Sequence, residues 1–286
     1  MKNKTILVTG ASGQLGNCIR LISDKYKFNF LFKNSKELDI TNKEKVVNFF
    51  EEHPIDFVIN CAAYTNVEQA EKEPEKAFLI NAEGTRNIAE SCKKNKIVLI
   101  HISTDYVFGG KGTKPYLEND IPNPINEYGK SKLKGEEYIR ELMDTYFIIR
   151  TSWLYSQFGH NFFKTILKKS ETEKKLTITT GEIGTPTNAN DLANFILAII
   201  KENRKEFGIY HYSNQGQASW YDFAKEIIKV SGKLDNIVLI KTDNYPTFVS
   251  RPKFSVLSKV KCERTFILKI GEWKEALQEV YFKYMN

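Results

Sequence analysis

The chain opens with an apolar, buried-type strand that runs into three closely spaced glycines and then into a helical pattern. The strand is expected over Lys4–Val8, and the glycines are Gly10, Gly13 and Gly16. Gly10 permits a tight turn, Gly13 lets the backbone approach a pyrophosphate, and Gly16 lets helix and strand pack closely, while the helix amides face the anion. This feature predicts a dinucleotide site in the first strand-turn-helix unit.

Strands and helices alternate through the first half of the chain. This alternation predicts an α/β fold, a doubly wound parallel (Rossmann) sheet with helices on both faces. Thr41–Glu44 indicates a capping box for a helix that ends at Pro54, Pro74 begins a helix that runs to about Lys94, and Asn126 is a candidate cap for the helix of Tyr128. The four further strands are expected over 28–32, 57–60, 97–103 and 146–150.

Past Thr151 the pattern loosens, which predicts a smaller, discontinuous substrate lobe. An apolar helix over 191–200 and a strand over 208–212 are expected to return to the main sheet. Residues 1–150 plus about 189–212 would form the dinucleotide-binding domain, and 151–188 plus 213–286 the substrate lobe. Within that lobe the sequence predicts a helix over 160–169, a strand over 176–180 and a helix over 220–231 capped by Ser219.

Two short runs have the spacing of a reductive active site: His101–Phe108 ends an apolar stretch, and Tyr128–Lys132 opens a helical one. Tyr128 and Lys132 share a helix face, so the ammonium can lower the pKa of the phenol from ~10. Such pairs also occur on solvated helices, but the glycine turn favours a catalytic role. Ketone reduction needs a hydride, a proton donor and a group that polarises the carbonyl, and we assign the last two to Tyr128 and Thr104.

Several motifs give the chain a resemblance to a known family. The glycine spacing together with Thr104, Tyr128 and Lys132 resembles the extended short-chain dehydrogenase/reductase superfamily. Finer motifs resemble the dTDP-4-dehydrorhamnose reductase family. They are Asp39–Thr41, Val58–Val67, Ser103–Phe108, Arg150–Trp153, Gly159–Phe162, Gly184–Thr187 and Arg251–Pro252. The resemblance implies reduction of dTDP-4-dehydro-L-rhamnose to dTDP-L-rhamnose by hydride transfer from NAD(P)H, within dTDP-rhamnose and polysaccharide biosynthesis.

The resemblance also implies a set of binding residues. It places the active hydroxyl at Thr104 rather than Ser103, in agreement with the alternation of neighbours along a strand. Lys132 would bond the nicotinamide ribose. The cofactor set is Gly10, Ser12, Gly13, Gln14, Leu15, Gly16, Lys33, Asp39, Ile40, Ala62, Ala63, Tyr64, Thr65, Tyr128 and Lys132. The substrate set is Thr104, Asp105, Tyr106, Trp153 and Arg251.

Two substrate residues and the choice of cofactor have open alternatives. Trp153 either faces the hexose or lies in the core of the second lobe. Arg251 suits a diphosphate because its planar fork makes bidentate bonds, but it can equally be a surface residue. No acid stands at the end of the second strand, 30–35, where NAD-specific sites place one. Lys33 could neutralise a 2′-phosphate, which Asn34 or Ser35 could bond, or it could be a solvated lysine. We expect NADPH, with NADH also accepted.

Composition excludes several other classes of protein. The net charge of +7 comes from dispersed lysines without a clustered aromatic patch, so no nucleic-acid partner is expected. The longest apolar run, Leu192–Ile200, falls short of the ~20 residues of a membrane span. No secretory h-region is present, which favours the cytoplasm.

The cysteines and histidines of the sequence give no indication of a metal site or a redox site. Four cysteines and four histidines show no ligand spacing, and we interpret all eight as ordinary residues. Some relatives are Mg²⁺-assisted dimers with interface carboxylates, whereas here Leu15 follows Gln14. No obligatory metal is predicted, and full activity after EDTA is expected. A Mg²⁺ effect and a homodimer stay open.

Three alternatives to the reductase hypothesis remain. Nucleotide-sugar 4,6-dehydratases resemble the chain but carry Thr-Asp-Glu where Thr104, Asp105 and Tyr106 stand, so elimination lacks its second carboxylate. Another nucleotide-sugar reductase or a 4-epimerase would use the same Thr, Tyr and Lys. A non-catalytic NADP-binding subunit, such as the regulatory subunit of methionine adenosyltransferase, has no physical need for a phenol and an ammonium at this spacing.

Overall fold

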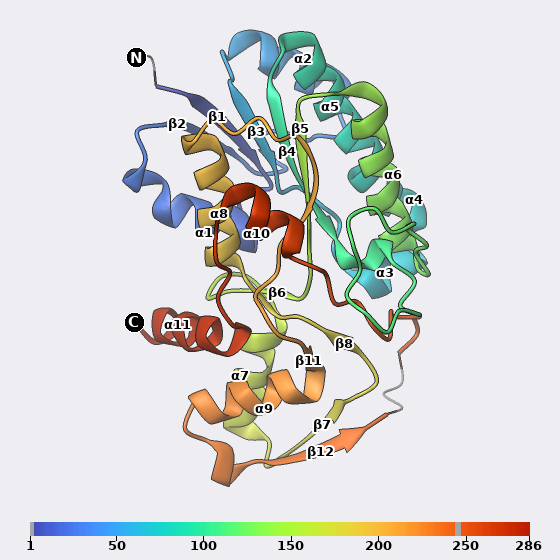
Figure 1. The fold of residues 1–286 in the computed structure, drawn as a ribbon, viewed down its shortest axis with the longest axis vertical. Helices are drawn as coiled ribbons and strands as arrows, with labels where there is room; N and C mark the ends of the chain where they lie inside the picture. Colours follow the sequence, from blue (N-terminus) through green and yellow to red (C-terminus); the bar gives the residue numbers. More distant parts are fainter. Residues whose placement is uncertain (1–2, 244–246) are drawn as a thin grey trace.

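A six-stranded, all-parallel sheet forms the larger part of the molecule in this computed structural model, which describes residues 3–243 and 247–286 (Figure 1). The order reverses between β1 and β3, which opens a crevice at the carboxyl ends of these strands. From edge to edge the strands are β10 (Gly208–His211), β5 (Tyr146–Thr151), β4 (Val98–Thr104), β3 (Phe57–Asn60), β1 (Thr5–Thr9) and β2 (Asn29–Lys33). The predicted doubly wound parallel sheet is therefore confirmed.

Helices cover both faces of this sheet because its strands are apolar on both sides. Ile6 and Val8 of β1 pack against α1 (Gln14–Ile22) and α8 (Ala189–Lys201), together with α10 (Val260–Phe266). Leu7 lies on the opposite face. The helices there are α2 (Lys43–Glu52), α5 (Gly84–Asn95) and α6 (Glu127–Leu142), and they lie on the other side of the sheet in Figure 1.

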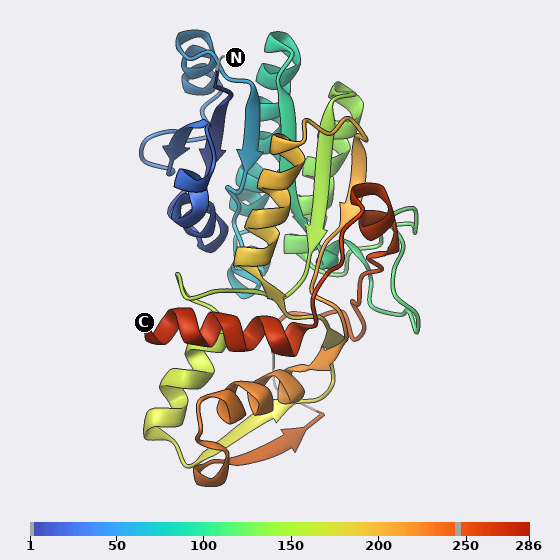
Figure 2. The same ribbon diagram turned by 60° about the vertical axis from the view of Figure 1, so that its left-hand side comes forward.

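A smaller lobe with its own apolar core lies below the carboxyl ends of the sheet (Figure 2). Three helices and a parallel pair of strands build it: α7 (Phe162–Thr172), α9 (Trp220–Val230), α11 (Trp273–Met285), β7 (Lys175–Thr179) and β12 (Val238–Thr242). Short strand pairs join it to the sheet, and they are β6 (Leu154–Tyr155) with β9 (Thr187–Asn188) and β8 (Ile183–Gly184) with β11 (Ala218–Ser219). The chain leaves this region for α8 and β10, which return to the main sheet as predicted, and β10 pairs there with β5. The boundaries assigned to the two domains stay a prediction.

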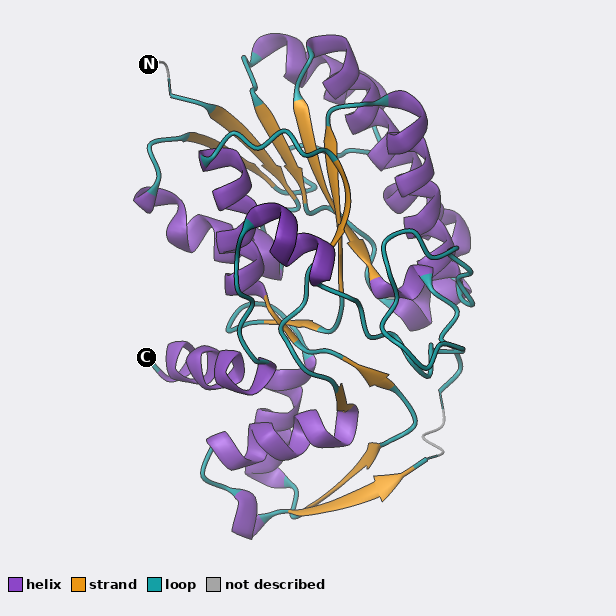
Figure 3. Cartoon of the chain, in the orientation of Figure 1, coloured by secondary structure: helices purple, strands orange, loops and turns teal. Residues whose placement is uncertain are grey.

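Local signals predicted some helix ends correctly and others wrongly. Asn126 and Ser219 cap α6 and α9 through their side chains. The capping box at Thr41 is wrong, because Asn42 accepts the cap bond from the Lys45 amide and Thr41 donates to Asp39 instead. The long helix expected after Pro74 is divided into α4 (Pro74–Phe78), a π-helical turn over Leu79–Glu83 and α5. The separate helix α3 (Val67–Lys72) precedes them. Figure 3, coloured by secondary structure, shows the helices on either side of the strands of the main sheet.

No helix within residues 3–243 and 247–286 has the length and apolar character that crossing a membrane would require.

Candidate active site

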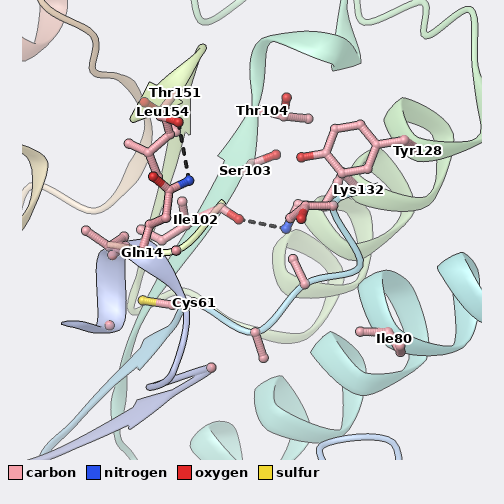
Figure 4. A pocket seen from close by; sticks show the side chains of 18 of the residues that line it. Gln14, Cys61, Ile80, Ile102, Ser103, Thr104, Tyr128, Lys132, Thr151 and Leu154 are labelled. Atoms are coloured by element: carbon pink, nitrogen blue, oxygen red, sulfur yellow. Dashed lines mark hydrogen bonds between the residues drawn. The ribbon is translucent and has the colours of Figure 1, made fainter. Parts of the chain in front are cut away.

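A cavity of about 760 Å³ lies at the carboxyl ends of β1, β3 and β4, where the sheet faces the smaller lobe (Figure 4). Its walls come from the glycine turn at one end and from β4, α6 and the smaller lobe at the other. A crevice at the point where strand order reverses is the usual ligand site of such sheets. The lining of the cavity includes residues from both the predicted cofactor set and the predicted substrate set.

The glycine turn has the geometry of a dinucleotide cradle. Gly10 adopts φ +61°, and a Cβ there would lie 2.6 Å from the Ala62 amide nitrogen, so only glycine fits between β1 and β3. A Cβ at Gly16 would lie 2.6 Å from Ala11 Cα. Gly13 precedes α1 and offers no side-chain cap, which leaves the first amides of α1 free to bind an anion at the cavity. The residues present therefore fit a bound pyrophosphate.

The structure brings most, but not all, of the predicted cofactor residues to the cavity. Those that line it are Gly10, Ser12, Gly13, Gln14, Leu15, Gly16, Asp39, Ile40, Ala62, Ala63, Thr65, Tyr128 and Lys132. Two predicted residues are not in this lining. The Lys33 ammonium lies 5.4 Å from the Phe49 ring centroid, and the Tyr64 hydroxyl donates to Glu73 at 3.2 Å.

The three proposed catalytic residues meet at the inner end of the cavity. Thr104 ends β4, Tyr128 lies in the first turn of α6 and Lys132 follows one turn later. The Lys132 ammonium is almost fully buried and donates to the Ile102 carbonyl at 2.7 Å. The Ser103 hydroxyl donates to Glu136 on the same helix as Tyr128. Ser103 and Thr104 both line the cavity (Figure 4), and the Thr104 hydroxyl donates to Asp105 at 3.0 Å, so the choice of Thr104 over Ser103 stays a prediction.

Burial dominates the electrostatics of this cluster. It raises the pKa of Tyr128 to about 12, the Asp105 charge adds to the rise, and a hydrogen bond with Thr104 opposes it. The predicted lowering of the Tyr128 pKa by Lys132 is therefore wrong for this structure. Burial also lowers the pKa of Lys132 to about 8 and raises that of Asp105 to about 7, against the hydrogen bond that Thr104 donates to it.

The predicted substrate residues all line the cavity. Asp105, Tyr106 and Arg251 lie beside Thr104 and Tyr128, and the rings of Tyr106 and Tyr128 meet edge to face at 5.7 Å. Arg251 donates from Nη2 to Glu68 at 2.9 Å, and its buried Nε has no hydrogen-bond partner within the described part of the chain.

Trp153 lines the cavity and also packs on the smaller lobe, and its contact with the hexose stays a prediction. Its ring lines the cavity and also stacks on Trp220, with centroids 3.7 Å apart. A Cβ at Gly184 would lie 2.6 Å from the Trp153 ring, so this glycine makes room for the indole. Trp153 thus packs on the core of the smaller lobe with one face exposed to the cavity.

Sequence analysis missed a contact that links the smaller lobe to the glycine turn. Gln14 Oε1 accepts from Asn161 Nδ2 at 2.9 Å and from Ser156 Oγ at 3.1 Å, while Gln14 Nε2 lies 3.4 Å from the Leu154 carbonyl (Figure 4). The motif Gly159–Phe162 supported the resemblance without receiving a role. Other lining residues without a predicted role include Cys61, Ile80, Thr151 and Trp220, whereas Ser35, a candidate for the 2′-phosphate, also lines the cavity.

Within residues 3–243 and 247–286 no group of three or more His, Cys, Asp or Glu side chains is placed to hold a metal ion. The predicted independence from Mg²⁺ stays a prediction.

Known proteins resemble this chain along nearly all of its length. A family model described as the RmlD substrate binding domain matches residues 4–286. The spore coat polysaccharide biosynthesis protein SpsK of Bacillus subtilis is 44% identical over 276 residues, which cover 96% of this chain and 95% of that protein. A dTDP-4-dehydrorhamnose reductase of Aggregatibacter actinomycetemcomitans is 36% identical over 286 residues, covering 96% and 97%.

Solved structures give the same result. A dTDP-4-dehydrorhamnose reductase from Bacillus anthracis in complex with NADP superposes with a TM-score of 0.94 at 36% identity, covering 99% of this chain and 100% of that one. A dTDP-4-dehydrorhamnose reductase from Clostridium acetobutylicum, described as an RfbD orthologue, has a TM-score of 0.94 at 39% identity, with the same coverage. A UDP-glucose 4-epimerase from Thermus thermophilus, at 18% identity, has a TM-score of 0.84 and shares the fold.

Proposed function

The chain belongs to the dTDP-4-dehydrorhamnose reductase family, and from this premise we propose that it reduces dTDP-4-dehydro-L-rhamnose to dTDP-L-rhamnose with NADPH. The observation that carries the proposal is the meeting of Thr104, Tyr128 and Lys132 in the cavity that begins at the glycine turn. NADPH, when bound, supplies the hydride that the sugar carbonyl carbon accepts. The residues of the chain supply binding, orientation and the proton.

Tyr128 donates the proton to the oxygen that becomes the hydroxyl group. A pKa of about 12 keeps its phenol protonated at neutral pH, which a proton donor requires. The Thr104 hydroxyl donates to the carbonyl oxygen and polarises it before attack. Lys132, with its ammonium next to the cavity, stabilises the phenolate that remains and bonds the nicotinamide ribose.

The cofactor is held along the wall that starts at the glycine turn. The first amides of α1, after Gly13, bind the pyrophosphate, and Asp39 and Ile40 lie beside the adenine. No acid stands among the residues that end β2, which supports NADPH with NADH also accepted. Ser35 lines the cavity whereas Lys33 does not, so we assign the 2′-phosphate contact to Ser35 in the first place.

The dTDP-sugar occupies the wall formed by Trp153, Asp105, Tyr106 and Arg251. The free Nε of Arg251 is a buried donor at the cavity, and a diphosphate oxygen would satisfy it. Tyr106 stands where a dehydratase would carry a carboxylate, which supports reduction rather than loss of water.

The test is NADPH oxidation at 340 nm with dTDP-4-dehydro-L-rhamnose. Tyr128→Phe should lower kcat by ~10²–10⁴ with little change in NADPH affinity. Tyr138→Phe is the matched control, because Tyr138 lies on the same helix as Tyr128 but outside the cavity, where its hydroxyl donates to Glu83 of the preceding π-helical turn. Near-normal turnover in Tyr128→Phe would contradict the assignment of the proton donor.

The assay also separates the alternatives. A sugar product formed without net NADPH consumption would favour an epimerase. NADPH binding without turnover of the keto-sugar would favour a binding subunit.

A further inference from the structure

A continuous line of buried hydrogen bonds leads from Lys132 away from the cavity. Lys132 Nζ lies 3.2 Å from His101 Nε2, and His101 Nδ1 lies 3.1 Å from the Asn60 carboxamide. Asn60 in turn lies 2.6 Å from Thr9 Oγ1. All four residues are at most 1% exposed, and the line crosses β4, β3 and β1, the three strands whose ends form the cavity floor.

The Lys132 ammonium determines which ring nitrogen of His101 carries the proton. An ammonium has only donors, so Nε2 of His101 must be the bare acceptor, and a neutral imidazole then carries its single proton on Nδ1. The structure places Asn60 Nδ2 3.1 Å from His101 Nδ1, and Asn60 Oδ1 accepts from Thr9 Oγ1. A proton on Nδ1 therefore requires the Asn60 carboxamide to turn by 180°, which exchanges two atoms of nearly equal size. Burial and the Lys132 charge both hold the pKa of His101 well below its usual range, so the ring stays neutral.

We propose that His101 is a positioning residue that anchors the Lys132 ammonium, so that two of its three N–H groups are held by the protein and the third serves the cavity. The two protein acceptors are His101 Nε2 and the Ile102 carbonyl. The inference rests on the proposed catalytic role of Lys132. Asn60 lies at the other ring nitrogen, Nδ1.

Several other groups act on the same ammonium. Glu136 lies one turn further along α6, Cys61 follows β3, and Tyr128 lies one turn before it. Burial lowers the pKa of Lys132 and the charges of Glu136 and Cys61 raise it. A hydrogen bond to the charged form favours that form, so loss of the His101 acceptor should lower the pKa of Lys132 further. The protonated lysine would then be lost at a lower pH.

Two substitutions separate anchoring from mere packing. In His101→Gln the carboxamide reaches the Nε2 position and can still accept from Lys132. In His101→Asn it ends at the Nδ1 position and keeps only the link to Asn60. Both variants lose the ring and keep an amide, so they form a matched pair.

The measurements are kcat/KM against pH and the NADPH dissociation constant against pH. In the wild type, kcat/KM should fall and the NADPH dissociation constant should rise as pH rises through the Lys132 pKa of about 8. In His101→Asn this limb should move down by about one pH unit, the size of one lost hydrogen bond to a charged group. His101→Gln should keep the limb near its wild-type position. Coincident limbs in the two variants would overturn the proposal.

NADPH binding keeps this test separate from the proposed reaction, because it needs no sugar. A wild-type protein that binds NADPH but fails to reduce the keto-sugar would refute the proposed function, while the shift of the binding limb would still report on His101. A third measurement needs no variant of His101. Nitrogen NMR of the wild-type protein, with the other three histidines assigned by single replacement, should show Nδ1 protonated and no titration between about pH 6 and 8. A protonated Nε2 would refute the anchor.

Discussion

Removal of Arg150 should cost far more stability than removal of any surface arginine. Arg150 of β5 and Glu136 of α6 form an ion pair whose side chains are each 1% exposed, with Nη2–Oε2 at 2.6 Å and Nε–Oε1 at 3.0 Å. Ser103 of β4 donates to the same carboxylate. The pair and the Ser103 hydrogen bond therefore hold α6, the helix that carries Tyr128 and Lys132, against β4 and β5.

The magnitude follows from what stays behind in Arg150→Met. Glu136 would lose three guanidinium hydrogen bonds and keep Ser103, which leaves a buried charge without its counter-charge. Breaking such a pair from one side costs about 3–5 kcal/mol, a large part of the 5–15 kcal/mol that typically holds a protein folded. The double variant Arg150→Met with Glu136→Leu leaves no charge behind, so its loss should be smaller than the sum of the two single losses.

Urea unfolding gives the free energies for this cycle. Arg86→Met is the control, because Arg86 pairs with Glu90 on the exposed side of α5, with 46% and 26% of the two side chains accessible, and such pairs contribute ~0–1 kcal/mol. Equal losses in Arg150→Met and Arg86→Met, or strict additivity in the double variant, would refute the reasoning. A fall in kcat that follows the loss of stability would support the fastening role.

Three further outcomes are expected. Ser35→Asp should lower kcat/KM with NADPH at least ~10-fold relative to NADH, because an acid repels a 2′-phosphate. Lys33→Ala should leave the ratio of the two kcat/KM values nearly unchanged. A changed ratio in Lys33→Ala with an unchanged ratio in Ser35→Asp would reassign the phosphate contact to Lys33. Arg251→Ala should raise KM for the nucleotide sugar and spare NADPH binding, and an unchanged KM would mark a structural arginine. Asp105 has a folded pKa of about 7 and an unfolded pKa of ~3.9, so the native state binds more protons than the unfolded state between these pH values. The contribution of Asp105 to the free energy of unfolding should therefore fall as pH rises from about 4 to 7. Asp105→Asn should remove this pH dependence.

The parts of the fold that sequence analysis predicted well are those with a strong local pattern. Strands β3 and β5 are apolar runs with buried positions throughout most of their length, and α9 begins at a complete capping box of Ser219 and Asp222. Strand β12 (Val238–Thr242) escaped prediction. Its residues are mostly exposed or half-buried, and it exists because it pairs with β7, some sixty residues earlier in the chain.

The same distinction holds within the active site. Thr104, Tyr128 and Lys132 could be predicted because each sits at a fixed offset in a short motif. His101 belongs to the same run but looked ordinary, since its partners Asn60 and Lys132 come from other elements. The link from Gln14 to Asn161 spans 147 positions, and no local spacing indicates it.

The pKa of Tyr128 shows where spacing alone misleads. Four residues along a helix bring two side chains to one face, but they do not decide which acceptor the ammonium chooses. Lys132 donates to the Ile102 carbonyl and to His101, so burial prevails at the phenol and its pKa rises. A high pKa suits a proton donor that must stay protonated until an alkoxide forms, because an alkoxide is the stronger base and the transfer to it remains favourable. Lys132 therefore contributes most after the proton has left, when the new phenolate lies near an ammonium that the protein already holds in place.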